Sequence, residues 1–118
     1  ESVTSIGETA FWFCTSLTSI TIPDSVTSIG RRAFEDCFSL TSITIGNGVT
    51  MIGRRVGYGS WAFQNCKSLT SVTFLGDAPK AGKNIFYKAT PTIYRKPEAK
   101  GWGDTFAGRP VKLISEKP

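Results

Sequence analysis

The sequence contains no histidine, the side chain that most often serves as a general base or a metal ligand in proteins. Serine and threonine are abundant, but no base is available to activate one of them as a nucleophile. Glu35 and Asp36 are adjacent, which fits a solvated turn better than the two separated carboxylates of a hydrolytic site. We therefore expect no enzyme, no catalytic residue, no cofactor and no metal site.

Long apolar segments are also missing, since no run approaches the ~20 residues that a membrane-spanning helix needs. The chain has neither an initiating methionine nor a secretory leader, and residue 1 falls inside an ordered pattern. Its composition, with 40% hydrophobic and 19% charged residues over 118 positions, is that of a globular protein. We expect a single domain that is a fragment of a longer chain.

Acidic residues are scarce in the last third of the chain. Residues 1–76 hold five basic and five acidic residues, whereas residues 77–118 hold nine and four and so carry the whole net charge of +5. This basic end either attracts an acidic partner by long-range steering or keeps the end of the domain solvated. It has no recognition helix and no RNA-binding signature, so we expect no nucleic-acid partner.

What the sequence does contain is an internal repeat. Residues 3–7 (Val-Thr-Ser-Ile-Gly) recur at 26–30 and, with one methionine, at 49–53, a period of 23. The Ala-Phe pairs that follow stand at 10–11, 33–34 and 62–63, so six residues are inserted in the third copy. A fixed period of this length indicates a solenoid, in which stacked units supply one another with a core.

Each repeat predicts a short series of elements. Residues 17–22 end in apolar positions that alternate with hydroxyls, which is typical of a half-buried strand, and 26–29 form a second, shorter extended piece. Residues 31–37 are long enough for only a helical turn or two. The period also predicts that Phe11, Phe34 and Phe63 stack as a buried ladder.

The pattern Ile-Gly-x-x-Ala-Phe-x-x-Cys-x-x-Leu-x-x-Ile-x-Ile-Pro-x-x-Val runs from residue 6 to 26 and, with Gly46 in place of proline, from 29 to 49. It resembles the BspA-like leucine-rich repeat family. The resemblance implies a mostly-β α/β solenoid, a right-handed leucine-rich repeat superhelix whose concave sheet is built from the Leu-x-x-Ile-x-Ile strands. It also implies a non-enzymatic protein-interaction module (adhesion or recognition) of a bacterial surface or secreted protein.

The domain is expected to consist of repeats over 1–90, with three full coils of 23 residues and a degenerate fourth, followed by a C-terminal β cap over 91–118. Two strands, 92–95 and 111–114, flank a turn-rich link in which Trp102 and Phe106 are placed to cover the last coil. A cap is needed because an open solenoid end exposes both core and strand edge.

Three cysteines occupy one repeat position, at Cys14, Cys37 and Cys66. Their spacing matches no zinc signature, and parallel side chains on stacked strands disfavour disulfides. We expect buried free thiols that tie down neighbouring backbone, and they say nothing about redox compartment.

The first candidate contact site is an edge that carries paired arginines and the inserted aromatics: Arg31, Arg32, Arg54, Arg55, Tyr58 and Trp61. The arginine pairs are one period apart, and arginine with tyrosine and tryptophan is the composition of interface hot spots. This composition fits a protein partner, including an acidic one. The alternative is that Glu35 and Asp36 neutralise the arginines while Trp61 plugs the bulge.

The second candidate is the row of hydroxyls on the concave strands: Ser19, Thr21, Ser42, Thr44, Ser71 and Thr73. Such a row fits a glycan or another repetitive surface. Threonine is also simply favoured on exposed strand faces. Aromatic residues at Trp12, Phe13 and Phe38 interrupt polar repeat positions, and they either pack on a preceding coil or form a ligand patch.

Overall fold

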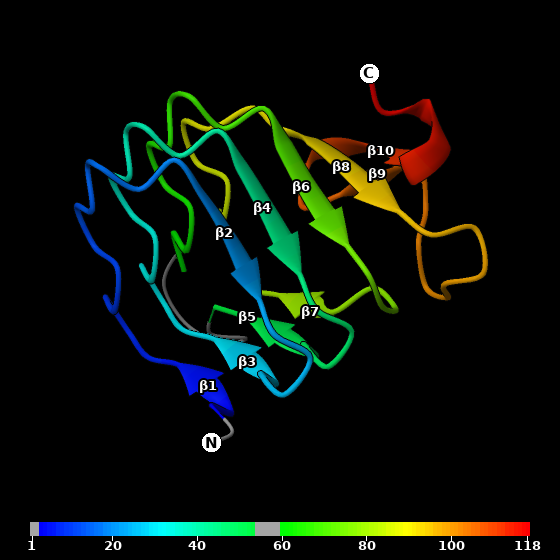
Figure 1. Cartoon of the computed structure of the whole chain (residues 1–118), viewed down its shortest axis with the longest axis horizontal. Coiled ribbons are helices and arrows are strands. Elements are labelled where there is room, and N and C mark those ends of the chain that lie inside the picture. Colours follow the sequence, from blue (N-terminus) through cyan, green and yellow to red (C-terminus); the bar gives the residue numbers. More distant parts are fainter. Residues whose placement is uncertain (1–2, 54–59) are drawn as a thin grey trace.

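The computed structural model describes residues 3–53 and 60–118 and contains two sheets of short strands (Figure 1). One sheet holds, in order, β1 (Ser5–Ile6), β3 (Ser28–Ile29), β5 (Met51–Ile52) and β7 (Lys80–Ala81). The other holds β2 (Ser19–Ile22), β4 (Ser42–Ile45), β6 (Ser71–Phe74), β8 (Thr92–Arg95), β10 (Arg109–Leu113) and β9 (Thr105–Phe106). The fold is mostly β, as predicted, and neighbouring strands run parallel except for β9 and β10.

Strand register follows the repeat. Ser19 lies opposite Ser42, which lies opposite Ser71, so the six inserted residues do not shift the pairing of the third copy. Backbone bonds also cross between turns, where the Phe11 N–H donates to the Ala33 carbonyl at 2.8 Å. Each coil therefore satisfies its polar backbone through the next one, which is why no single coil is stable alone.

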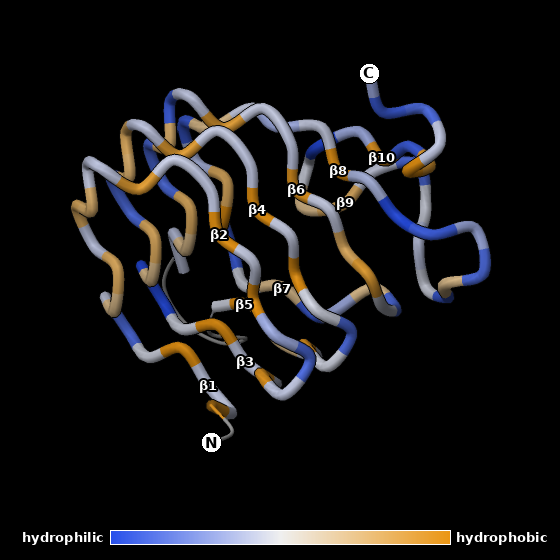
Figure 2. The backbone as a smooth tube through the Cα atoms, viewed as in Figure 1, coloured by the Kyte–Doolittle hydropathy of each residue, from blue (hydrophilic) through white to orange (hydrophobic). Residues whose placement is uncertain are grey.

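Hydrophobic positions recur at corresponding places along successive coils (Figure 2), and their buried side chains form the core. Four phenylalanine rings stack along one column, with centroid distances of 5.1, 5.4 and 5.3 Å from Phe11 through Phe34 and Phe63 to Phe86. The predicted ladder is confirmed for Phe34 and Phe63, which are fully buried, while Phe11 at its end is only partly buried. Phe86 extends the ladder by one ring.

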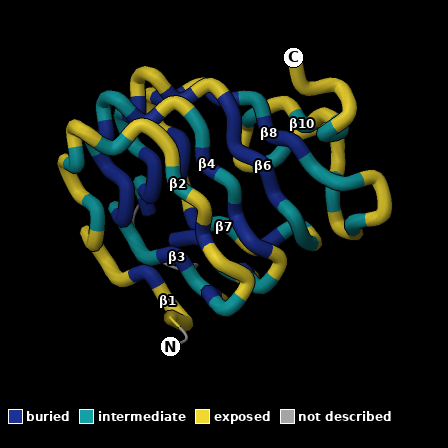
Figure 3. Tube along the Cα trace, viewed as in Figure 1, coloured by how far each residue is buried: buried dark blue, intermediate teal, exposed yellow. Residues whose placement is uncertain are grey.

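Burial is incomplete at the β1 end of the stack (Figure 3). Leu17 and Ile20 are partly exposed, whereas their repeat mates Leu40 and Ile43 are buried, because the first coil has a neighbour on one side only. An open apolar hollow of about 300 Å³ lies there, lined by side chains of the first coil.

The expected helical turn at 31–37 is wrong in one respect: within the described residues this segment and its repeat mates form hydrogen-bonded turns, not helix. Two positions four residues apart interrupt any helix because their backbone is left-handed, with φ between 48° and 65°. The first column is Thr9, Arg32, Trp61 and Asn84, and the second is Phe13, Asp36, Asn65 and Lys88. Only asparagine and aspartate among these adopt that conformation readily.

Residues 91–118 continue the larger sheet. The first predicted strand is β8, and the second begins earlier than expected and becomes β10, which pairs with β8 in parallel and with β9 antiparallel. Trp102 and Phe106 pack on Phe74 with ring distances of 5.0 and 5.4 Å. A short 3-10 helix, η1 (Ile114–Glu116), follows β10.

Candidate functional site

Two guanidinium groups gather on one indole. The Cζ atoms of Arg31 and Arg32 lie 5.2 and 4.7 Å from the Trp61 ring centroid, within the range of a cation–π interaction. Backbone geometry brings these residues together, since the Arg32 N–H donates to the Ser60 carbonyl at 2.9 Å and so fixes the two turns side by side. Trp61 is partly buried beneath the two arginines.

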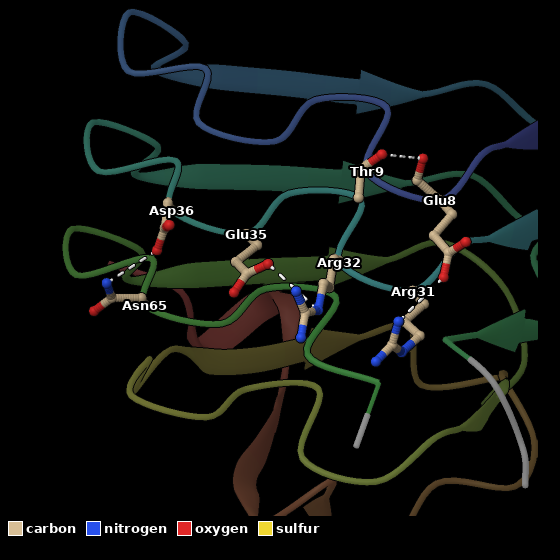
Figure 4. A network of polar contacts seen from close by, with 7 residues as sticks. All are labelled: Glu8, Thr9, Arg31, Arg32, Glu35, Asp36 and Asn65. Atoms are coloured by element: carbon tan, nitrogen blue, oxygen red, sulfur yellow. Dashed lines mark hydrogen bonds and ion pairs between the residues drawn. The ribbon is translucent and has the colours of Figure 1, made fainter. Parts of the chain in front are cut away.

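Each arginine also faces a carboxylate (Figure 4). Arg31 Nη1 donates to Glu8 Oε2 at 3.3 Å, and Arg32 Nε lies 3.7 Å from Glu35 Oε1. Of the alternative in which Glu35 and Asp36 neutralise the arginine pairs, the described residues contain the contact between Glu35 and Arg32. Asp36 instead accepts a hydrogen bond from the Asn65 side-chain amide at 3.0 Å, and Glu8, one coil earlier, takes its place.

The negative charge of the buried Glu35 carboxylate is poorly compensated by its surroundings. Its side chain is 12% exposed, against 39% for Arg32, and neither Glu35 Oε1 nor Arg32 Nε has a hydrogen-bond partner among the described residues. Burial raises the pKa of the Glu35 carboxyl above 4.5, and the nearby Arg32 charge only partly opposes that rise. Arg32 is thus held near the surface by a long ion pair and by the indole face.

Of the six residues of the first candidate site, the structure thus brings Arg31, Arg32 and Trp61 into one cluster. Arg54, Arg55 and Tyr58 lie outside the described residues. We refer below to Arg31, Arg32 and Trp61 as the arginine–tryptophan edge.

The hydroxyl row on the strands is not a uniform surface. Ser19 and Thr21 are exposed and Ser42 and Thr44 are half-buried. Ser71 and Thr73 retain only 8% and 6% of their accessible surface. The chain's own end contributes, because Lys117 Nζ donates to Thr73 Oγ1 at 3.1 Å and lies 5.5 Å from the Tyr94 ring centroid.

The cysteine column is structural. Cys37 and Cys66 are buried free thiols, as expected, while Cys14 in the first coil is partly exposed. Their Sγ atoms donate to the carbonyls of Phe11 and Phe34, each at 3.1 Å, and so tie one coil to the previous one. Burial raises the pKa of the Cys37 thiol and raises that of Cys66 to about 12.

Two features of the site were missed from sequence. The Glu8–Arg31 pair was detectable, since the two residues are one period apart and opposite in charge. The Lys117–Thr73 contact was not, because it joins a residue outside the repeat to one inside it.

Within the described ranges, no helix is long and apolar enough to cross a membrane. Nor do those residues contain a group of three or more cysteine, aspartate or glutamate side chains that could hold a metal ion.

Comparison with solved structures finds the crystal structure of a leucine-rich repeat protein of T. pallidum, with a TM-score of 0.52 and 21% identity. The match covers 78% of this chain and 52% of the other, so this chain spans about half the length of its structural neighbour. No curated protein matches. Residues 1–95 match the family described as the BspA type leucine rich repeat region, in six copies. Together with the stacked parallel strands, this match shows that the chain belongs to the BspA-type leucine-rich repeat family.

Proposed function

We propose that this chain is a non-enzymatic protein-interaction module of a bacterial surface or secreted protein, and that it binds an acidic partner through the arginine–tryptophan edge. Leucine-rich repeat domains are typically binding modules, and BspA-type members are typically surface or secreted proteins, which supports the class of function. The observation that carries the site is the pair of guanidinium groups on the Trp61 ring.

The chemistry of that edge suits carboxylates. A guanidinium group offers up to five N–H donors in a planar fork, which matches a carboxylate better than an ammonium group does. Stacking on an indole orders the arginine before a partner arrives, so less side-chain entropy is lost on binding. With 39% of its side chain exposed and only a 3.7 Å ion pair, Arg32 is the member best placed to bind a second carboxylate.

The finer description of the fold is part of this proposal. Residues 1–90 form a right-handed superhelix of 23-residue coils, and residues 91–118 form a cap that closes its β8 end. The pairing of β10 with β8, the packing of Trp102 and Phe106, and the repeat register support this description. Arg54, Arg55 and Tyr58 extend the same edge in the proposal, by the sequence period alone.

A glycan-binding role for the hydroxyl row has weaker support. A repetitive ligand such as a glycan needs a repetitive surface. Because Ser71 and Thr73 are buried, only two of the three strands in the row present accessible hydroxyl groups. In addition, the Thr73 hydroxyl already accepts a hydrogen bond from Lys117 Nζ.

The repeat supplies matched substitutions for a test. Arg32→Thr and Trp61→Asn install the residues that stand at the same position in the first and fourth copies, Thr9 and Asn84. The double variant should fold, yet a partner captured from bacterial surface extract and then purified should bind it at least about tenfold more weakly. Equal binding of a purified partner to the wild type and the double variant would exclude the arginine–tryptophan edge.

A glycan array probed with the wild type and with a Thr21→Ala, Thr44→Ala variant tests the other class. Array binding that depends on these two threonines, without any protein partner, would replace the proposed function with a glycan-binding one. If partner binding depends neither on Arg32 and Trp61 nor on Thr21 and Thr44, the contact surface lies elsewhere on the domain.

A further inference from the structure

Three aromatic residues stand at three repeat positions where most of the other copies have polar, non-aromatic side chains. Trp12 stands where the other copies have Glu35, Gln64 and Tyr87. Phe13 stands where they have Asp36, Asn65 and Lys88, and Phe38 where they have Thr15, Lys67 and Thr90. Phe13 and Phe38 stand at positions outside the buried core, whereas the position of Trp12 is buried in the second copy, where Glu35 retains 9% of its accessible surface. Core packing therefore does not explain the aromatic residues at the positions of Phe13 and Phe38.

The three aromatic residues meet at one place on the turn side of the first two coils. The rings of Trp12 and Phe13 are 6.1 Å apart, and Phe13 contacts Phe38 edge to face at 5.9 Å. Trp12 and Phe13 remain 55% and 56% exposed. Phe13 thus contacts an aromatic residue of the following coil. We call Trp12, Phe13 and Phe38 the aromatic cluster.

Phe13 is unfavourable for folding on two counts. Its backbone is left-handed, with φ of 61°, a conformation that asparagine and aspartate at the same position in other copies adopt more readily. More than half of its surface is also left in water, and that exposed part does not stabilise the fold. A strained and exposed aromatic residue at an otherwise polar position points to a role in binding.

The surroundings of the cluster indicate what it binds. Lys67 Nζ lies 5.6 Å from the Phe38 ring centroid, and no carboxylate among the described residues forms an ion pair with it. The ring planes of Trp12 and Phe13 are inclined by 41°, and those of Phe13 and Phe38 by 87°, so they offer no common flat face for stacking a sugar. Residues 1–76 carry no net charge, which disfavours an extended anionic membrane surface as the ligand.

We infer that the aromatic cluster is a second binding surface, separate from the arginine–tryptophan edge, for a polypeptide segment with an apolar side chain next to a carboxylate. The apolar side chain packs between the inclined rings, and the carboxylate pairs with Lys67. The interaction depends on ring surfaces that are already in place, so the cluster binds without rearrangement of the turns.

The test uses a phage-displayed library of random linear peptides, selected on the wild-type chain and counter-selected on the variant Trp12→Gln, Phe13→Asn, Phe38→Thr. These substitutions copy Gln64, Asn65 and Thr15 from the same repeat positions, so the variant should fold. Selected peptides should share an aromatic or aliphatic residue beside an aspartate or glutamate. They should bind the variant, and Lys67→Ser, at least about tenfold more weakly than the wild type.

Thermal stability distinguishes a binding residue from a folding residue. Phe13→Asn alone should leave the melting temperature unchanged or higher, because it relieves the strained backbone, while peptide binding falls. A lower melting temperature would show that Phe13 is retained for folding and would overturn the inference. So would a library that yields no peptide dependent on the cluster.

Two controls separate this surface from others. Tyr87→Gln removes the exposed aromatic residue of the fourth copy, in the same column as Trp12, and should leave peptide binding unchanged. The Arg32→Thr, Trp61→Asn variant should also retain peptide binding. The two proposed binding surfaces can then be tested independently of each other. Loss of peptide binding in either control would contradict a separate site, as would cluster-dependent binding to phosphatidylcholine–phosphatidylserine vesicles.

Discussion

The rings of Phe34 and Phe63 lie parallel to within 4°, with their centroids 5.4 Å apart, although the residues belong to coils separated by the six-residue insertion. Both rings are fully buried, and each is covered on its other side by a further phenylalanine. The insertion therefore leaves the core column intact.

Replacing Phe34 by alanine should lower the free energy of unfolding by ~3–5 kcal/mol, because the cavity lies between two rings and cannot collapse. Phe11→Ala, at the partly exposed end of the same column, should cost less and serves as the matched control. Denaturant titration followed by circular dichroism measures both. Equal costs for the two variants would contradict the ladder as a continuous core element.

Thiol reactivity should divide the cysteine column. In native protein Cys66 should resist Ellman's reagent, because a pKa of about 12 leaves a thiolate fraction on the order of one in ten thousand at pH 8 and the sulfur is buried. Cys37 should be protected as well, and Cys14 should react first because it is only partly buried. All three should react in denaturant. Rapid native labelling of two or three thiols would show that the coils open more readily than their packing suggests.

Glu35 should contribute measurably to the pH dependence of the free energy of unfolding. Because its pKa in the folded protein is raised above 4.5, the folded state keeps a proton that the unfolded chain loses as pH rises through this window. The stability of the wild type relative to Glu35→Gln should therefore fall as pH rises from the ordinary pKa of a glutamate through the raised pKa of Glu35. Glu98→Gln, at an exposed turn, is the control and should not reproduce this change. A relative stability that rises with pH would mean that the ion pair with Arg32 outweighs burial.

The repeat predicted features that depend on stacking, namely the phenylalanine ladder and the column of free cysteines. It did not predict the left-handed columns, because Thr9, Arg32 and Trp61 are poor formers of that conformation and their neighbours in the stack impose it. Nor did it predict the contact of Lys117 with Thr73, since Lys117 lies outside the repeat. Contacts between repeat copies can be predicted from the period, whereas contacts made by residues outside the repeat cannot.

Gly7 and Gly30 occupy the same repeat position but differ in what lies beside them. A Cβ atom added at Gly30 would stand 2.7 Å from the backbone nitrogen of Glu8, in the preceding coil, whereas one added at Gly7 would meet nothing within 4 Å. Neither glycine has a positive φ, so the difference is steric contact between coils and not backbone conformation.

Gly30→Ala should therefore lower the free energy of unfolding by ~1–3 kcal/mol, since backbone must move to admit the methyl group. Gly7→Ala should be neutral or stabilising by up to ~1 kcal/mol, because alanine reduces the entropy of the unfolded chain. Denaturant titration of the two variants side by side measures the closeness of coil stacking directly. If both substitutions cost the same, the glycines serve the local turn, and the close approach of Gly30 to the first coil is not what requires them.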